Sequence, residues 1–370
     1  MIDSKHLRAI AFYLPQFHPI PENDEWWGKG FTEWTNVTRA KPLFKGHYQP
    51  QLPADLGFYD LRLPEVREAQ AALAQEYGIH GFCYYHYWFK GRRLLERPFE
   101  EVLASGKPDF PFCLCWANEN WTRRWDGDEQ QVLMAQEYSI EDDRRHMQAL
   151  APALRDRRCI RVKDRPLFMV YRAFRLPDPQ RTVAVWRAEA KRLGIGEIYL
   201  CCVESLGSEQ GFVDSCGFDA AVEFAPDWRC LGPALGRKIA WRLAARVGLI
   251  GRSYLINSVF DYRQLAANML AKGVPEYLRY PCVSPSWDNS ARRARGAFIL
   301  HGASPEVYEW WLEEVLKRFQ PPSPDENLIF INAWNEWGEG NHLEPCQRWG
   351  RKYLEATRNA LSSAVEQPKQ

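Results

Sequence analysis

The sequence lacks any apolar run long enough to cross a bilayer, which takes about 20 consecutive residues. The segment from Met1 to Ile10 also lacks the continuous apolar core of a secretory signal peptide. We therefore expect a chain without membrane-spanning helices that works in the cytoplasm.

Several motifs of metal and cofactor chemistry are also missing. Ten cysteines are present, but no two have the C-x-x-C spacing of a zinc or redox site. Cys113, Cys115, Cys201 and Cys202 lie in apolar runs, where cysteine behaves as a small hydrophobic residue. There is no G-x-S-x-G nucleophile elbow, and no glycine-rich phosphate loop follows the first strand-like run. We expect reduced thiols, no metal, no cofactor and no Ser-His-Asp triad.

An excess of charge of one sign is missing too. The chain has 48 basic and 47 acidic residues, which gives no support to nucleic-acid binding. The segment from Arg237 to Arg252 is nevertheless basic and amphipathic. It fits an insertion helix with a solvated cationic face, which we favour. The alternative is peripheral contact with a membrane or a lipid-linked glycan.

What the sequence does contain is a series of short apolar runs that alternate with helix-like segments. Helices are expected from Leu63 to Gly78, from Arg181 to Leu193, and after an N-cap at Ser304. The alternation predicts a parallel sheet, and eight runs predict a (β/α)8 TIM barrel with long βα loops. An open doubly wound sheet is the alternative. The eight runs are Arg8–Leu14, Gly81–Tyr85, Phe112–Trp116, Leu167–Tyr171, Ile198–Val203, Ala220–Phe224, Tyr280–Ser284 and Leu328–Ala333.

The runs also indicate the domain organisation. A single catalytic barrel is expected over residues 7–355. The stretch at about 226–279 exceeds a standard βα unit, so we expect an inserted helical region there. Residues 356–370 are expected to form a C-terminal tail.

Polar and aromatic side chains follow each apolar run. The carboxyl ends of barrel strands share one face, where TIM-barrel enzymes carry their active sites, so these side chains are expected in one cleft. The aromatic content is 14%, with 16 tryptophans, and many rings fall in polar clusters as if exposed to a ligand. The candidate substrate-binding residues are Tyr13, Gln16, His18, Trp34, Tyr85, His86, Tyr87, Trp116, Asn118, Glu119, Trp121, Tyr171, Glu223, Trp287, Asp288 and Asn335.

The most informative stretch begins with the last apolar run, Leu328–Ala333, and then changes abruptly to Trp, Asn, Glu and Gly. Glu336 and Glu339 lie where this strand should pass into a loop. Two carboxyl groups can share the proton transfers at the anomeric carbon of a sugar, and tryptophan rings can stack on its faces. The stretch therefore predicts a carbohydrate-active enzyme with Glu336 and Glu339 as its catalytic residues.

Structural roles for these glutamates remain open. Glu336 and Glu339 could instead cap the following helix or pair with Arg123 or Arg124. Glu344 is ambiguous as well, because it could support the pair from behind or anchor the loop near Pro345.

Five strings of the chain resemble the WbsX-like family, which belongs to polysaccharide and lipopolysaccharide biosynthesis clusters. The resemblance covers roughly residues 8–350. That family in turn resembles glycoside hydrolase family 99, the endo-α-mannosidases and endo-α-mannanases, through the barrel and an Asn-Glu-Trp-x-Glu-Gly string. The five strings are Phe12-Tyr-Leu-Pro-Gln-Phe-His-Pro, Trp27-Gly-Lys-Gly-Phe-Thr-Glu-Trp-Thr-Asn-Val, Gly81-Phe-Cys-Tyr-Tyr-His-Tyr-Trp-Phe, Trp116-Ala-Asn-Glu-Asn-Trp-Thr-Arg-Arg-Trp-Asp and Trp334-Asn-Glu-Trp-Gly-Glu-Gly.

The resemblance to family 99 implies a retaining, endo-acting hydrolase of a bacterial surface glycan or exopolysaccharide. By position, Glu336 would be the base that activates the sugar's own 2-hydroxyl, and Glu339 would be the acid/base. Glu339 would then need a raised pKa, which a neighbouring carboxylate and apolar tryptophan walls provide.

Two other functions compete with hydrolysis. A glycosyltransferase is the label that WbsX-like proteins often carry, and Asp126-Gly-Asp128 is a D-x-D string of the kind that holds a metal on a nucleotide diphosphate. A sugar-binding protein without catalysis is the third possibility. The presence of both Glu336 and Glu339 argues against it.

Overall fold

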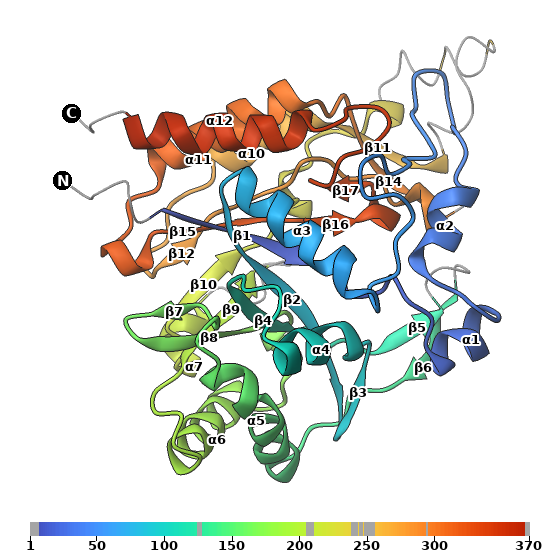
Figure 1. Cartoon of the computed structure of the whole chain (residues 1–370). Helices are drawn as coiled ribbons and strands as arrows, with labels where there is room; N and C mark the ends of the chain where they lie inside the picture. The colour runs from blue at the N-terminus through green and yellow to red at the C-terminus, as the bar shows by residue number, and fades with distance from the viewer. Residues whose placement is uncertain are drawn as a thin grey trace.

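Parallel strands surrounded by helices form a barrel in the computed structural model of the chain (Figure 1). The structure describes residues 7–123, 128–204, 211–237, 243, 247, 256–293 and 295–366. The strand order along the barrel is β12-β10-β9-β8-β4-β2-β1-β15-β13. These strands are β1 (Arg8–Tyr13), β2 (Ile79–Phe89), β4 (Phe112–Trp116), β8 (Arg165–Val170), β9 (Tyr199–Glu204), β10 (Ala220–Glu223), β12 (Arg279–Tyr280), β13 (Cys282–Val283) and β15 (Leu328–Ile331).

The barrel closes through a strand that is divided at Pro281. On one side of this residue β12 pairs in parallel with β10, and on the other side β13 pairs in parallel with β15. Proline has no N–H to donate to a ladder, which accounts for the division. Its carbonyl still accepts a 2.9 Å hydrogen bond from the backbone N–H of Phe330. β12 and β13 are therefore two halves of one strand, and the eight predicted strand runs and the (β/α)8 fold are confirmed.

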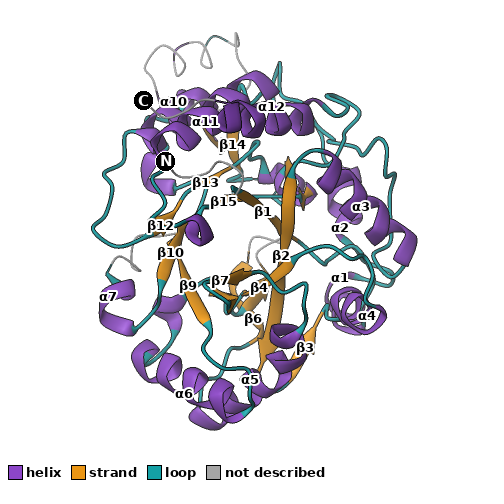
Figure 2. Ribbon diagram, turned by 60° about the vertical axis from the view of Figure 1, so that its left-hand side comes forward, coloured by secondary structure: helices purple, strands orange, loops and turns teal. Residues whose placement is uncertain are grey.

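Helices cover the outside of the barrel, as Figure 2 shows. The predicted helices are present as α3 (Pro64–Glu76), α6 (Pro179–Arg192) and α11 (Pro305–Arg318). The Ser304 side chain accepts a hydrogen bond from the N–H of Val307 at the start of α11. The helices that follow the strands are α3 (Pro64–Glu76), α4 (Arg97–Ser105), α5 (Ile140–Arg155), α6 (Pro179–Arg192), α7 (Phe212–Cys216), α10 (Tyr262–Leu270), α11 (Pro305–Arg318) and α12 (Lys352–Glu366).

The βα loops are long and carry structure of their own. The first loop contains two short helices, and others form small sheets at the rim of the barrel. These elements bring loop residues over the carboxyl ends of the strands. They are α1 (Pro21–Trp27), α2 (Glu33–Arg39), β3 (Arg92–Leu94), β5 (Trp121–Arg123), β6 (Asp128–Met134), β11 (Ser258–Asp261), β14 (Phe298–His301), β16 (Asn335–Glu336) and β17 (Asn341–His342). The short strand β7 (Arg161–Val162) lies at the opposite end, where it pairs with the start of β8.

The C-terminal boundary differs from our expectation. Residues 356–366 are not a tail, because they belong to α12. Leu354 and Ala360 of this helix are buried, and α12 packs against α11. The expected insertion at 226–279 contains α10 and β11 in its described part. The basic segment 237–252 lies outside the described residues, apart from Arg237, Leu243 and Val247.

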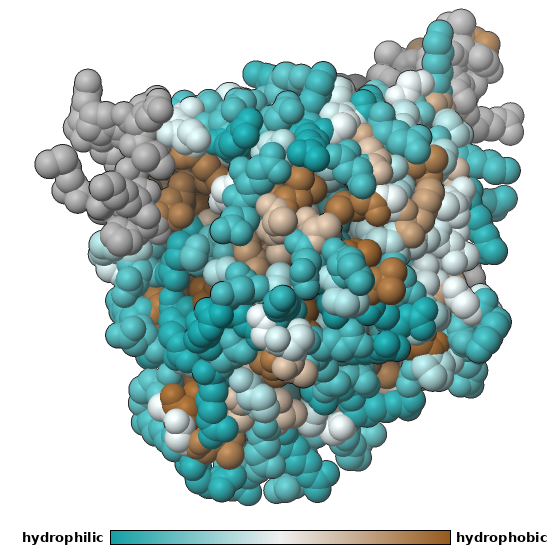
Figure 3. All heavy atoms as spheres, viewed as in Figure 1, coloured by the Kyte–Doolittle hydropathy of each residue, from teal (hydrophilic) through white to brown (hydrophobic). Residues whose placement is uncertain are grey.

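Apolar side chains fill the barrel and the layer between strands and helices. The strands are buried on both faces, as continuous apolar runs predict. Cys113, Cys115, Cys201 and Cys202 are all buried, so their expected role as small core residues is confirmed. The face of the molecule in Figure 3 is mainly hydrophilic, with scattered apolar areas. Among the described residues, no helix has the length and apolar character of a membrane span.

Candidate active site

The local backbone explains how Glu336 and Glu339 reach the carboxyl face of the barrel. After β15 the chain enters the β16–β17 hairpin, whose turn is the 3-10 helix η8 (Trp337–Glu339). Gly340 ends this turn with a φ of 57°, a left-handed conformation that favours glycine. Gly338 is required for a different reason, because a Cβ atom there would lie 2.1 Å from Glu33 Oε1. The two glycines therefore permit a tight turn that carries both glutamates.

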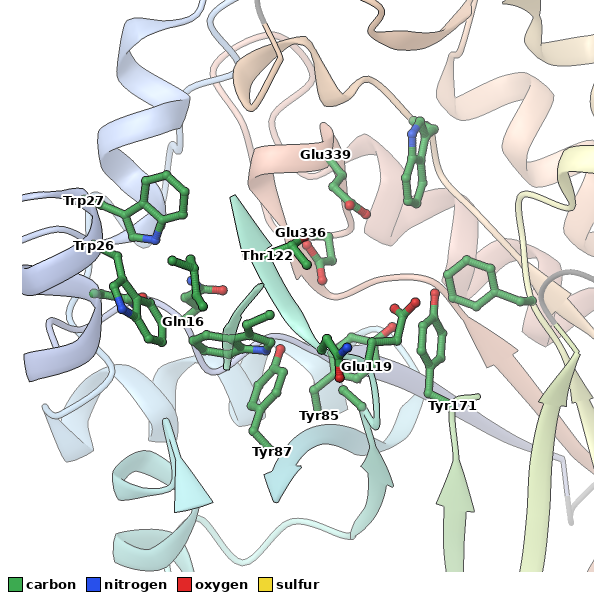
Figure 4. A pocket seen from close by; sticks show the side chains of 17 residues that line it. Gln16, Trp26, Trp27, Tyr85, Tyr87, Glu119, Thr122, Tyr171, Glu336 and Glu339 are labelled. Carbon is green, nitrogen blue, oxygen red and sulfur yellow. The ribbon is translucent and has the colours of Figure 1, made fainter. Parts of the chain in front are cut away.

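Glu336 and Glu339 lie in an open cleft of about 220 Å³ at the carboxyl ends of the strands. Side chains that follow six of the strands line it, as expected for a TIM barrel. Figure 4 shows Trp26 and Trp27 at one end, Tyr171 at the other, and the two glutamates between them. The lining residues are Gln16, Asn23, Trp26, Trp27, Tyr85, Tyr87, Ala117, Glu119, Asn120, Trp121, Thr122, Leu133, Tyr171, Phe224, Trp287, Glu336 and Glu339.

The guanidinium of Arg292 joins the two glutamates. Its Nη2 lies 3.0 Å from Glu336 Oε2, and its Nη1 lies 2.6 Å from Glu339 Oε1. On its other side, Nε and Nη2 each lie 3.0 Å from a carboxylate oxygen of Glu33. One cation thus holds three carboxyl groups, so Glu336 and Glu339 are neighbours at the same point of the cleft.

Burial sets the proton affinity of this pair. Removal from water raises the pKa of Glu336, and repulsion from Glu339 raises it further, while Arg292 opposes both effects. Burial likewise raises the pKa of Glu339 against the attraction of Arg292. Two adjacent carboxyl groups with raised pKa values can hold one proton between them near neutral pH. This distribution is what general acid–base chemistry requires.

Aromatic rings form two walls on either side of the pair. On one side the ring of Trp121 lies 5.6 Å from Trp26 and 5.2 Å from Tyr87. On the other side the ring of Tyr171 lies 5.3 Å from that of Phe224. Such walls can stack on the apolar faces of sugar rings.

The two tyrosines of β2 add hydrogen-bond donors next to the pair. Burial raises the pKa of Tyr85 and of Tyr87, so each phenol keeps its proton and can donate to a hydroxyl oxygen. Of the residues expected in the cleft, those that line it are Gln16, Tyr85, Tyr87, Glu119, Trp121, Tyr171, Trp287, Glu336 and Glu339.

His86 and Trp116 do not line the cleft, and our expectation for them is wrong. They are partners in the β2–β4 ladder, so both side chains point to the same side of the sheet, towards the helices. The His86 ring stacks on His146 of α5 at 5.1 Å, with the two Nε2 atoms 3.0 Å apart. The Trp116 ring packs against Trp186 of α6. Successive residues of a strand face opposite sides, so Tyr85 and Tyr87 line the cleft while His86 does not.

Tyr13, His18 and Trp34 also lie away from the cleft. Tyr13 faces the helix layer, where its hydroxyl donates a 2.7 Å hydrogen bond to Gln70 Oε1. Trp34 is packed among aromatic rings and donates from Nε1 to the Tyr59 carbonyl. His18 is buried, which lowers its pKa to about 4. These side chains support the first βα loop from behind.

Asn118 and Asn335 connect strand ends rather than facing the cleft. Asn118 accepts a hydrogen bond from the N–H of Arg172 at 2.8 Å and donates one to its carbonyl at 2.9 Å. Asn335 makes the same pair of bonds with Leu14, at 2.7 and 3.0 Å. Each amide thus links the chain after one strand to the chain after another, which orients the neighbouring Glu119 and Glu336.

Glu223 and Asp288 are held by ion pairs and hydrogen bonds outside the cleft. Glu223 lies 2.6 Å from Lys272 Nζ, which also contacts Asp227. Asp288 accepts from His47 Nε2 at 2.6 Å and from Gln49 Nε2 at 2.8 Å. A polar side chain at a strand end can either line the cleft or join loops, and the sequence contains no signal that distinguishes these two roles.

The most important residues that the sequence interpretation missed are Arg292 and Glu33. Arg292 follows the seventh strand within the run Ala291-Arg-Arg, close to Trp287, which was the only available signal. Glu33 lies inside one of the quoted strings and is fully buried. Under the alternative structural role, the partners of the glutamates would have been Arg123 or Arg124. Arg124 lies outside the described residues, as does the side chain of Arg123.

Glu344 supports the site from behind. Its buried carboxylate accepts hydrogen bonds from Trp337 Nε1 and Gln70 Nε2, each at 2.6 Å, and from the Tyr59 hydroxyl at 2.8 Å. Burial outweighs these donors and raises the pKa of Glu344 to about 7. Trp337 belongs to the turn between Glu336 and Glu339. Because its indole is hydrogen-bonded to Glu344, Glu344 helps to fix the turn that carries the pair.

Comparison with solved structures defines the fold class. A family GH99 endo-alpha-mannosidase from Bacteroides thetaiotaomicron has a TM-score of 0.56 with 14% identity, and the match covers 98% of both chains. A structure described as a glycoside hydrolase-like protein has a TM-score of 0.58 with 13% identity, covering 96% of this chain and 94% of that one. At such identities the likeness concerns the fold, which is the barrel of these proteins.

Sequence comparison then defines the family. The family described as Glycosyltransferase WbsX matches residues 9–357, and the chain belongs to this family. The uncharacterized protein WxcX of Xanthomonas campestris pv. campestris (strain B100) is 48% identical over 364 residues, covering 96% of this chain and 50% of the relative. The same protein of strain ATCC 33913 is equally similar. The chain spans about half the length of these curated relatives.

Proposed function

We propose that this chain is a carbohydrate-active enzyme that hydrolyses glycosidic bonds of a bacterial surface glycan or exopolysaccharide through Glu336 and Glu339. The observation that carries the proposal is the contact of one guanidinium with both carboxyl groups, in a cleft with aromatic walls at the carboxyl face of a barrel. Paired carboxyl groups and aromatic walls are the elements of glycosidase sites. The fold that the chain shares with family 99 supports the same class.

The chemical step follows the retaining route that the resemblance implies. Glu336 removes the proton of the sugar's 2-hydroxyl, and that oxygen attacks the anomeric carbon as the bond to the leaving oxygen breaks. Glu339 donates its proton to the leaving oxygen. It then takes a proton from water, which opens the 1,2-anhydro sugar, and Glu336 returns its proton to the 2-oxygen. Burial raises the pKa of both groups, which lets the pair hold the proton that the acid must supply; the assignment of Glu339 as the acid comes from its position in the string.

Walls on both sides of the pair support binding in the middle of a chain. Trp26 and Trp121 would hold sugar units on one side of the broken bond, and Tyr171 and Phe224 would hold units on the other. This arrangement favours endo-acting cleavage over removal of a terminal sugar.

The direct test is the release of reducing ends from purified α-mannan and from a panel of bacterial exopolysaccharides. The wild type should release them from at least one polymer, and Glu336→Gln should not. Glu355→Gln, which changes an exposed glutamate of α12, serves as the matched control and should behave as wild type. Equal release by wild type and Glu336→Gln would contradict the proposal.

A glycosyltransferase is the second candidate, and the description of the family favours it. The D-x-D string expected to hold a metal begins at Asp126, which lies outside the described residues. Thermal shift measurements separate the two functions, because a ligand that binds the folded state raises the unfolding temperature. A nucleotide diphosphate with Mn²⁺ should stabilise a transferase, whereas mannose oligosaccharides or iminosugars should stabilise a hydrolase.

A further inference from the structure

The three carboxyl groups around Arg292 are held in different ways. Glu33 takes the guanidinium in a fork, with contacts to both Nε and Nη2 at 3.0 Å. The Glu33 side chain is fully buried, so this fork is a fixed support. Glu336 and Glu339 are each bound by a single nitrogen on the side of Arg292 that faces the cleft. Arg292 is therefore anchored from behind and directed at the pair.

The absence of a side chain at Gly338 leaves room for the fork between Glu33 and Arg292. A Cβ atom on Gly338 would lie 2.7 Å from Arg292 Nε and 2.1 Å from Glu33 Oε1. Only a residue without a side chain lets the fork reach the turn between the two glutamates. The same turn thus carries the pair and admits the cation.

Charge in this region is unevenly distributed. Within the described part of the chain, three carboxyl groups contact Arg292, and Arg293 also acts on Glu339. Tyr85 and Tyr87 of β2 face Glu336 and Glu339, and Tyr171 faces Glu339, as neutral phenols. In a buried site, two adjacent carboxylates that both carried a full negative charge would repel each other strongly. Arg292 opposes the protonation of both, and Glu33 promotes it.

We propose that Arg292, anchored by Glu33, is a positioning residue that keeps Glu336 and Glu339 as a pair sharing one proton. This inference rests on the proposed function, because the shared proton matters only if the two glutamates act as base and acid. Arg292 keeps one carboxylate ionised within the buried cleft, and the negative charge of Glu33 prevents Arg292 from ionising both. The two groups therefore act on the pair in opposite directions.

Because Arg292 and Glu33 affect the protonation of the pair in opposite directions, their effects can be distinguished from those of residues with a purely structural role. The ionisation of the pair can be followed without any substrate, by ¹³C NMR of the side-chain carboxyl carbons in protein labelled at glutamate. Comparison with Glu336→Gln and Glu339→Gln assigns the two signals. In the wild type these signals should titrate jointly, with two separated steps, as coupled groups do.

Two substitutions should shift the titration midpoints of the pair in opposite directions. Arg292→Met removes the cation and should raise the midpoints of both signals by about 1 to 3 pH units. Glu33→Gln keeps an oxygen that accepts from Arg292 but removes a negative charge, so both midpoints should fall. Arg292→Lys keeps the charge and should leave the midpoints near those of the wild type, although it cannot form the fork. Arg157→Met, which removes an exposed ion pair with Asp109, is the matched control and should change neither signal.

The outcomes separate the inference from the proposed function. Midpoints that do not move in Arg292→Met, or that move in the same direction in Arg292→Met and Glu33→Gln, would overturn the inference. If Arg292→Met does not fold, as circular dichroism would show, Arg292→Lys and Glu33→Gln still decide it, because only Glu33→Gln should shift the midpoints. Polymer cleavage that persists in Glu336→Gln would instead overturn the proposed function, whatever the titration shows.

Discussion

Glu33 Oε1 lies so close to the backbone of Gly338 that a Cβ atom on that glycine would be 2.1 Å away from it. The fork between Glu33 and Arg292 therefore fills the space where a side chain would otherwise stand. In the string Trp337-Gly-Glu-Gly, the first glycine, Gly338, is therefore needed because the side chains of Glu33 and Arg292 approach its backbone closely. Its second glycine, Gly340, adopts a left-handed conformation.

Gly338→Ala should displace the fork and with it the two catalytic candidates. Overpacking of a buried site typically costs about 1 to 3 kcal/mol, so a loss of this order in the free energy of unfolding is expected. Cleavage should fall further than stability alone explains, because Arg292 would move. Urea denaturation and a reducing-end assay measure the two effects. Gly273→Ala is the control, since no atom lies within 4 Å of a Cβ there. If Gly338→Ala and Gly273→Ala have the same stability and activity, the close approach of Glu33 and Arg292 to Gly338 does not contribute to function.

The roles of Glu336 and Glu339 should differ in how the rate of each variant depends on the leaving group of the substrate. Glu336→Gln removes the base and should slow every substrate alike. Glu339→Gln removes the proton donor, so an aryl glycoside with an acidic leaving group should be partly rescued. General acid–base catalysis is worth about 10²- to 10⁴-fold in rate, so both defects should be plain. Kinetics of each variant on a glycan and on its aryl analogue provide the comparison, and wild-type rates in both folded variants would exclude glycosidase chemistry at this pair.

Tyr87 and His86 should differ sharply although they are neighbours in β2. Tyr87→Phe removes a donor from the cleft and should lower kcat/KM by about two- to tenfold, the usual worth of one hydrogen bond. His86→Gln disturbs the buried contact with His146. It should lower the free energy of unfolding by about 1 to 3 kcal/mol and leave kcat/KM unchanged. A fall in kcat/KM in His86→Gln that matches that of Tyr87→Phe would contradict the orientation of this strand.

Glu344 should make the stability of the protein depend on pH. Its pKa is raised by burial to about 7 in the folded chain, whereas an unfolded glutamate titrates near pH ~4.3. The folded state therefore binds the proton more tightly, and the stabilisation is lost as pH rises from about 4.3 through the folded pKa. The change is on the order of 4 kcal/mol.

The test is a comparison with Glu344→Gln, which has no titrating proton. The free energy of unfolding of the wild type should exceed that of the variant most at pH 5, and the difference should shrink towards pH 8. Urea denaturation at several pH values measures this difference. A difference that is constant with pH would show that Glu344 does not titrate in this range.

Local composition was sufficient for the fold and for the location of the cleft. β4 coincides with the predicted run Phe112–Trp116, and even the strand divided at Pro281 lies within the predicted run Tyr280–Ser284 apart from its first residue, Arg279. Continuous apolar runs are buried wherever they pack, so the chain's composition marks them directly. The polar residues after them then identify the carboxyl face, where Glu336 and Glu339 lie.

Which side each residue faces was decided only by the tertiary structure. The sequence places Tyr85, His86 and Tyr87 equally at a strand end, but the pleat sends His86 to the helices. Arg292 meets Glu33 across 259 residues of chain and Glu336 across 44. Such meetings depend on how loops fold over the barrel, and no local propensity encodes them. The sequence thus determined the barrel and the glutamates, and the packing of distant loops determined the cation between them.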